Sequence, residues 1–218
     1  MEHQTILPDI NLLTVRDDDL CCDYCGSNQE WFADAWQRKA GCGPSVAANI
    51  LFYQQRKLQI IPPLNYLKKH LLHYMEEAWK YITPGRNGIT NTDTFLQKVR
   101  GYALAHNLKL HYEALDIPAD KVQRPSSNAV IDFVASGLNK ETPVAFLNLC
   151  NGAELNLEQW HWVTIAALRY DLEKTAGKAI ICDEGITKEI DLTLWLSTTT
   201  LGGGFAYFLP HQKSDMEE

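Results

Sequence analysis

The sequence lacks a long apolar run, an internal repeat and an excess of basic charge. No apolar stretch in its 218 residues reaches the roughly 18–20 residues that a membrane-spanning helix needs. Lys and Arg number 20 against 27 Asp and Glu, so the net charge is -7. Because contact with phosphates needs a basic surface, nucleic acid is not an expected partner. Residues 1–19 lack the basic and then apolar start of a secretory signal, so we expect a cytoplasmic protein that does not bind membranes.

The six cysteines do not suggest a disulfide framework. They are Cys21, Cys22, Cys25, Cys42, Cys150 and Cys182. The chain is long enough to bury a core without cross-links, and the first two cysteines are adjacent in sequence. We therefore expect reduced thiols, as is usual in a cytoplasm.

A metal site is an alternative for two clusters. One is the cysteine cluster of residues 21–25, with His3 as a distant ligand, and the other is the pair His70 and His73 on one predicted helix. Zinc requires four ligands, which usually come from two paired motifs, and neither cluster has a second motif to complete it. We expect no metal and no other cofactor.

Helical spacing of apolar residues dominates the first part of the chain. It predicts helices over residues 43–57 and 63–82, a third helix that Thr92 caps, and a fourth over 127–138. A short strand is also possible near residues 10–15.

Short apolar or alternating runs follow, and they predict strands. These runs cover residues 108–115, 143–149, 160–170, 179–183 and 205–209, with a short helix or turn at 191–197. Helices first and strands afterwards indicate an α+β fold in one domain. We expect a mostly helical lobe over residues 30–140 and a mostly sheet lobe over 141–210. Residues 1–30 are expected to be an N-terminal extension that wraps the surface.

A cysteine between two glycines, followed by a proline and an apolar helix, is the most informative motif. Pro44 suits the first position of a helix, and Cys42 then lies at the helix N-terminus. Unpaired N–H groups and the helix dipole favour an anion there, so the thiol tends to ionise and to act as a nucleophile. A small buried residue is the alternative for Cys42. Cys150 is a rival nucleophile, although it closes a strand instead of starting a helix.

A cysteine nucleophile needs a base and an acceptor that orients the base. His161 opens the predicted strand 160–170, and Asp183 ends an apolar strand. If these strands pair antiparallel through a turn near residues 173–177, the two side chains meet at the same end. Asp183 is then expected to accept the Nδ1–H of His161 and to leave Nε2 facing the thiol. Glu184 is the alternative to Asp183.

The oxyanion of such a reaction needs hydrogen-bond donors. The backbone N–H of Cys42 is one candidate. The side-chain amide of Gln37, five residues before the cysteine, is the second. Trp160 and Trp162 are expected to line the cleft.

These motifs resemble those of papain-like cysteine peptidases. The order is a cysteine before a helix, a histidine at a strand start, and then a carboxylate. The local motif sequences are closer to those of a bacterial branch, the bacteriocin-leader-processing peptidases of peptide exporters, which contain CGP-type and HWV-type motifs. Here these are Cys42-Gly43-Pro44 and His161-Trp162-Val163, followed by Asp183 and the glycine-rich ending 202–208.

The resemblance covers roughly residues 30–210 and implies a papain-like fold, with the active site between a helical lobe and an antiparallel sheet. It implies a thiol-dependent hydrolase of peptide or amide bonds that uses Cys42, His161 and Asp183. Gln37 departs from the pattern, because it lies one residue nearer to the cysteine than in papain-like enzymes.

Two other functions fit the same residues. One is an acyltransferase, and the other is a catalytically inactive module that binds peptides in the cleft. The loops at residues 84–91 and 150–158 are expected to set specificity. The sequence leaves the substrate and the oligomeric state open.

Overall fold

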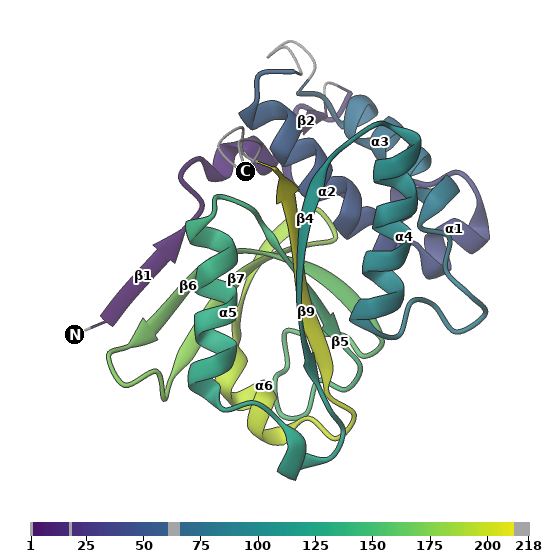
Figure 1. Cartoon of the computed structure of the whole chain (residues 1–218). Coiled ribbons are helices and arrows are strands. Elements are labelled where there is room, and N and C mark those ends of the chain that lie inside the picture. The colour runs from purple at the N-terminus through teal and green to yellow at the C-terminus, as the bar shows by residue number, and fades with distance from the viewer. Residues whose placement is uncertain (1, 18, 61–65, 212–218) are drawn as a thin grey trace, which may run out of the picture.

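A computed structural model describes residues 2–17, 19–60 and 66–211. One antiparallel sheet carries the fold (Figure 1). In spatial order its strands are β4 (Leu110–Ile117), β9 (Gly203–Pro210), β5 (Val144–Asn148), β6 (His161–Asp171), β7 (Gly177–Asp183) and β8 (Ile186–Asp191). β1 (Glu2–Ile6) pairs with the second half of β6, beyond the part of β6 that pairs with β5. A separate hairpin consists of β2 (Thr14–Asp17) and β3 (Cys22–Cys25).

Helices lie on both sides of the sheet. They are α1 (Ala35–Ala40), α2 (Cys42–Lys57), α3 (Lys68–Tyr81), α4 (Thr92–Ala105), α5 (Ser127–Asn139) and α6 (Leu192–Thr198). Figure 1 shows α1 to α4 gathered on one side, and α5 and α6 on the other. Within the described part of the chain, none of these helices has both the length and the apolar character to cross a bilayer.

Strand alternation divides the central sheet between two apolar cores. In β5, Val144 and Phe146 pack in the core that contains α5, and Ala145 and Leu147 pack in the core that contains α2, α3 and α4. Successive side chains of a strand point to opposite faces, and every residue of β5 is buried. The sheet is therefore covered on both faces, which fixes the helices of both sides to it.

Helix α2 is the central element of the helical side. It packs against both β6 and α3, and nearly all of its residues from Gly43 to Arg56 are buried. Gly41 is its N-cap, and the Ser45 N–H donates to the Gly41 carbonyl at 2.9 Å. Pro44 is thus the third helical residue and not the first. It lies in the first turn, where its missing N–H leaves no helix bond unmade.

The predicted helices over residues 43–57 and 127–138 are confirmed within one residue at each end, as are the central strands. The helix predicted from residue 63 begins at Lys68, and residues 61–65 lie outside the described part. The predicted cap of α4 is wrong, because Asn91 Oδ1, and not Thr92, accepts the Thr94 N–H at 2.7 Å. The turn or helix at 191–197 is α6, whereas α1 and β8 were not predicted.

The N-terminal extension does not simply wrap the surface. Residues 2–6 form a strand of the main sheet, and Leu7, Leu13 and Val15 are buried. A 3-10 helix (Ile10–Leu13) and β2 replace the strand expected near residues 10–15. Segments this short and mixed in polarity show no apolar periodicity from which a strand could be predicted. Pairing with a partner strand stabilises them, and their own sequence does not reveal that pairing.

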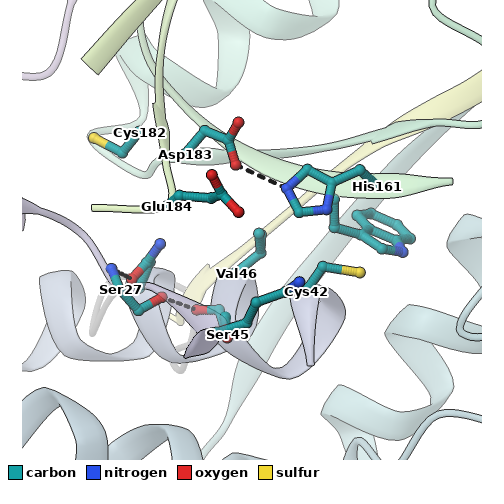
Figure 2. Close-up of a pocket in the computed structure, with 11 residues that line it drawn as sticks. Ser27, Cys42, Ser45, Val46, His161, Cys182, Asp183 and Glu184 are labelled. Carbon is teal, nitrogen blue, oxygen red and sulfur yellow. Dashed lines mark hydrogen bonds and ion pairs between the residues drawn. The ribbon is translucent and has the colours of Figure 1, made fainter. Parts of the chain in front are cut away.

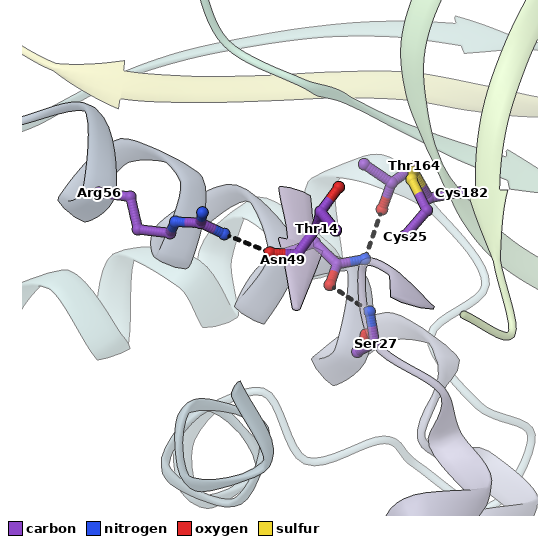
Figure 3. Close-up of a disulfide and its surroundings, with 7 residues drawn as sticks. All are labelled: Thr14, Cys25, Ser27, Asn49, Arg56, Thr164 and Cys182. Carbon is purple, nitrogen blue, oxygen red and sulfur yellow. Dashed lines mark hydrogen bonds between the residues drawn. A yellow bond between two sulfur atoms is a disulfide. The ribbon is translucent and has the colours of Figure 1, made fainter. Parts of the chain in front are cut away.

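A disulfide joins the extension to the sheet (Figure 3). It links Cys25 of β3 to Cys182 of β7, with the two Cα atoms 5.4 Å apart and 157 residues between them in sequence. The expectation that all six cysteines are reduced is therefore wrong for this pair. Sequence spacing gave no sign of it, since the pairing depends on how β3 packs against the end of β7.

Candidate active site

The thiol of Cys42 lies at the first position of α2. The N–H groups of the first turn have no partner inside a helix, and no side chain caps them here. Gly41 is needed immediately before it, because a Cβ there would lie 2.3 Å from the Gln37 carbonyl oxygen and 2.7 Å from the Phe32 ring. The tight junction between α1 and α2, together with Phe32, thus explains one of the two glycines that flank the cysteine.

His161 and Asp183 meet at one end of the β6–β7 pair, as predicted. Nε2–H of His161 donates to Asp183 Oδ1 at 2.7 Å, and both residues are buried. The predicted orientation of the ring is wrong, since Nε2 and not Nδ1 makes this bond. The register pairs Thr164 with Cys182, and its continuation would place Asp183 opposite Val163. His161 is then a diagonal neighbour of Asp183 across the strand pair. The ring nitrogen farthest from its Cβ, Nε2, is the one that extends far enough to bond to the carboxylate.

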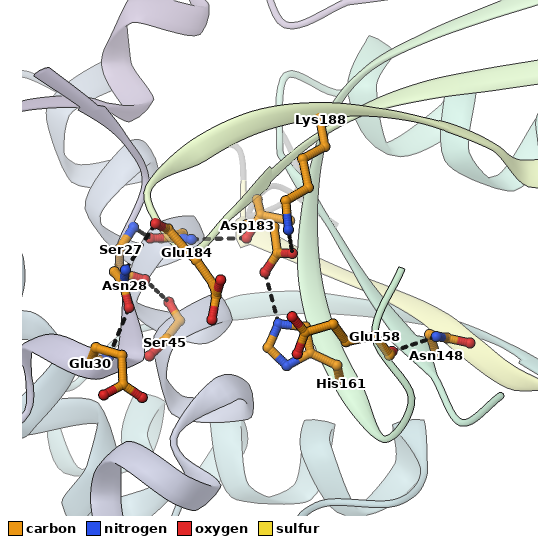
Figure 4. A network of polar contacts seen from close by, with 12 residues as sticks. Ser27, Asn28, Glu30, Ser45, Asn148, Glu158, His161, Asp183, Glu184 and Lys188 are labelled. Atoms are coloured by element: carbon orange, nitrogen blue, oxygen red, sulfur yellow. Dashed lines mark hydrogen bonds and ion pairs between the residues drawn. The ribbon is translucent and has the colours of Figure 1, made fainter. Parts of the chain in front are cut away.

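Asp183 has a second partner on the next strand. Lys188 Nζ of β8 donates to Asp183 Oδ2 at 2.8 Å (Figure 4). Burial would raise the pKa of Asp183, but the hydrogen bonds from His161 and Lys188 outweigh it and lower that pKa from its ordinary value. The carboxylate therefore stays ionised and holds the ring of His161 in one orientation.

The other nitrogen of the His161 ring faces the helix start. Figure 2 shows the ring between Asp183 on one side and Cys42 on the other. Burial alone would lower the pKa of His161, but hydrogen bonds to Asp183 and to Cys42 raise it to about 10. A protonated imidazole beside a sulfur favours the thiolate form of that sulfur, which is the reactive one.

A small hollow opens beside these residues, and we call it the His161 pocket. Its volume is about 20 Å³, and its lining includes Gln29, Cys42, Ser45, His161, Asp183 and Glu184. Two polar atoms of this lining, Gln29 Oε1 and Ser45 Oγ, are buried with no hydrogen-bond partner in the described part of the chain. The pocket therefore offers polar groups to a bound molecule.

Gln37, the predicted oxyanion donor, does not line the His161 pocket. It lies on the short helix α1, where its backbone N–H donates to Asp34. Gln29 occupies the pocket instead, and sequence reasoning missed it. Gln29 lies further upstream in a 3-10 turn (Gln29–Trp31), where no spacing rule connects it to Cys42.

A buried network fixes the segment that carries Gln29. Asn49 of α2 accepts the Ser27 N–H at 2.8 Å and donates to Thr164 Oγ1 of β6 at 2.9 Å (Figure 3). Asn28 Nδ2 donates to the Glu184 carbonyl at 2.9 Å (Figure 4). With the disulfide at residue 25, these bonds tie the segment to both sides of the pocket.

A wider hollow lies on another side of Cys42, and we call it the tryptophan groove. Its volume is about 210 Å³, and its lining includes Trp36, Lys39, Cys42, Arg86, Leu149 and Trp160. One wall is the loop 86–90, which Trp162 Nε1 holds by donating to the Ile89 carbonyl at 2.7 Å.

The predicted positions of the two tryptophans are confirmed, since Trp160 lines the groove and Trp162 lines the His161 pocket. Of the two loops expected to set specificity, the loop 84–91 contributes to the groove. The loop 150–158 lines neither the groove nor the His161 pocket.

The rival residues lie in other settings. Cys150 follows β5 and lines neither hollow, and a hydrogen bond from Thr200 Oγ1 lowers the pKa of its thiol to about 7. Glu184 lines the His161 pocket, but the bond to His161 is made by Asp183. Among the described residues no three His, Cys, Asp or Glu side chains gather as a metal site would require.

Comparison with known proteins bears on the fold alone. No family model matches the chain, and no curated protein matches its sequence. The mixed helices and antiparallel sheet are compatible with an α+β papain-like fold. The solved structure that carries this comparison is the crystal structure of UfSP from C. elegans, with a TM-score of 0.51 and 11% identity. The match covers 92% of this chain and 34% of the other, so this chain spans about a third of its length.

Proposed function

We propose that this protein is a cysteine peptidase of papain-like fold that hydrolyses a peptide or amide bond. The observation that carries the proposal is the ring of His161, bonded through Nε2 to the buried Asp183 and facing Cys42 at the start of a helix. The likeness to UfSP is one of fold, and it is compatible with the papain-like fold of this proposal.

Acylation begins from a thiolate and an imidazolium. Cys42 Sγ attacks the substrate carbonyl carbon, and a C–S bond forms while the carbonyl oxygen becomes an oxyanion. We assign the backbone N–H of Cys42 and the side-chain amide of Gln29, which lines the His161 pocket, as the donors that stabilise it. His161 then gives its Nδ1 proton to the leaving nitrogen, the C–N bond breaks, and the amine departs.

Deacylation uses the neutral imidazole as a base. His161 takes a proton from water, and the resulting hydroxide attacks the thioester carbon. The second tetrahedral intermediate collapses with cleavage of the C–S bond, which releases the acid and restores the thiolate and the imidazolium. Asp183 remains ionised throughout and keeps the ring in place. An acyltransferase would differ only in the nucleophile of this second stage.

The test is turnover of a library of peptide–aminocoumarin amides by purified protein. We expect the wild type to release the fluorophore, Cys42→Ala to release none, and Cys150→Ala, the matched thiol control, to remain active. Activity that survives in Cys42→Ala or disappears in Cys150→Ala would contradict the proposal. Product analysis by mass spectrometry with an added amine separates hydrolysis from acyl transfer, and peptide binding without turnover would favour a non-catalytic module.

A further inference from the structure

We propose that the tryptophan groove binds the acyl side of the substrate and selects an acidic peptide segment that also carries apolar side chains. This inference rests on the proposed peptidase function, and it names the class of substrate for the same site.

The direction of the substrate follows from the path of the proton. His161 must deliver its proton to the leaving nitrogen, so the leaving group lies on the side of His161. Cys42 lines both hollows, whereas His161 lines only the pocket named after it. The acyl part therefore extends the other way, into the groove of about 210 Å³, which has far more room than the 20 Å³ of the pocket.

The charge of the groove is opposite to that of the protein as a whole. Lys39 and Arg86 line it, and no Asp or Glu does, although the chain has a net charge of -7. Neither cation has an ion-pair or hydrogen-bond partner for its side chain within the described residues. Elsewhere Lys57 pairs with Glu141 and Lys68 with Asp17.

Two aromatic walls complete the groove. Trp36 and Trp160 are 42% and 55% exposed, which is unusual for residues with so large an apolar side chain. Trp160 also has a φ of 56°, a left-handed conformation that is rare for a bulky residue. It stands immediately before His161. An exposed tryptophan held in a strained conformation next to a reactive centre points to a role in binding.

The other side of Cys42 lacks the basic side chains of the groove. Asp183 and Glu184 line the His161 pocket, and no Lys or Arg does. His161 and Lys188 balance the charge of Asp183, whereas no acidic side chain that lines the groove balances Lys39 and Arg86. An acidic segment is therefore attracted more strongly to the groove than to the leaving-group side. A difference in charge between the two sides favours one direction of binding as well as one class of peptide.

Binding is measured first without catalysis, on the Cys42→Ala variant. The probes are acetyl-Glu-Asp-Leu-Gly-amide and acetyl-Lys-Arg-Leu-Gly-amide, and the signals are tryptophan fluorescence and calorimetry. We expect the acidic peptide to bind about tenfold more tightly at low salt, because two ion pairs of exposed groups add modestly. High salt should reduce the difference, because it screens exposed charges.

Charge reversal supplies the matched comparison. In the Cys42→Ala background, Lys39→Glu with Arg86→Glu should reverse the preference, and Lys109→Glu, a lysine that lines neither hollow, should leave it unchanged. Lys39→Gln with Arg86→Gln, which removes charge without adding any, should abolish it. Equal binding of both peptides, or a preference that survives charge reversal in folded protein, overturns the groove assignment.

The corresponding coumarin amides then separate this proposal from the proposed function. Cleavage by the wild type with about a tenfold preference in kcat/KM for the acidic peptide supports both. Selective binding of the acidic peptide without cleavage supports the groove and contradicts the peptidase. Cleavage without charge preference supports the peptidase and contradicts the groove.

Discussion

The orientation of one imidazole ring determines how a proton can move through this site. His161 uses the nitrogen far from its Cβ to reach Asp183, which leaves the nearer nitrogen for Cys42. Lys188 holds the second carboxylate oxygen of Asp183, so the acceptor is itself oriented. The result is a short row of charges that alternate in sign from Lys188 through Asp183 to His161, and the ring of His161 faces the sulfur.

This arrangement predicts a broad pH profile. The pKa of His161 is raised to about 10, so the imidazolium is present at neutral pH and is lost as the pH rises through that value. The pKa of Asp183 is lowered, so its carboxylate stays ionised on the acid side. We expect kcat/KM to fall only as the pH approaches about 10.

In Asp183→Asn the alkaline fall should move to lower pH, because the negative partner that raises the pKa of His161 is gone. We expect kcat to drop by about 10²-fold. Glu184→Gln is the matched control and should keep the wild-type alkaline limb. Identical limbs in Asp183→Asn and the wild type would show that Asp183 does not set the ionisation of the base.

The two upstream glutamines give a second prediction at this scale. Gln29 lines the His161 pocket and Gln37 does not. We expect Gln29→Ala to lower kcat by about 10²-fold with little change in KM, because the donor acts on the oxyanion and not on the bound substrate. Gln37→Ala should remain close to wild type in a steady-state assay. The reverse result would restore the assignment that sequence spacing favours.

At the scale of elements, the tight junction at Gly41 between α1 and α2 positions the thiol. A Cβ on Gly41 would collide with the Gln37 carbonyl and the Phe32 ring. We expect Gly41→Ala to shift the start of α2, to lower activity, and to reduce the free energy of unfolding by about 1–3 kcal/mol.

Gly101 supplies the control for this substitution. It lies inside α4, is exposed, and has nothing within 4 Å of a built Cβ. Gly101→Ala should raise the free energy of unfolding by up to about 1 kcal/mol, since alanine favours a helix interior. Urea denaturation of both variants measures the two effects, and a stable, active Gly41→Ala would contradict the packing argument.

The same elements show what the sequence could predict. The long amphipathic helices and the central strands follow from apolar periodicity, and the pairing of β6 with β7 brings His161 to Asp183. The ring orientation could not be predicted, because it depends on a diagonal register in a strand pair with an irregularity after Ile165. Gln29 was missed because folding of the extension, and not sequence distance, brings it to the pocket.

At the scale of the whole molecule, the N-terminal extension is part of the fold. β1 adds a strand to the sheet, and the segment after β3 lines the His161 pocket. The disulfide between Cys25 and Cys182 fastens this extension next to Asp183. The helical side, the sheet and the extension therefore converge on one place.

This long-range link predicts a measurable stabilisation. Replacing Cys25 and Cys182 together with alanine should lower the free energy of unfolding by about 2–5 kcal/mol, because the cross-link closes a very long loop in the unfolded chain. Denaturation of the oxidised protein, with Cys150→Ala as a single-thiol control, gives the comparison. Equal stability of the double variant and the wild type would show that the two thiols are not joined in solution.

The most direct measurement of the central claim is the rate at which iodoacetamide alkylates Cys42 at about pH 6, followed by peptide mass mapping. An ordinary thiol has a pKa of about 8.5 and reacts slowly at that pH. We expect rapid alkylation of Cys42 in the wild type and slow alkylation in His161→Ala, because the ring of His161 faces the sulfur and is the group proposed to activate it. Equal rates in the two proteins would contradict that role.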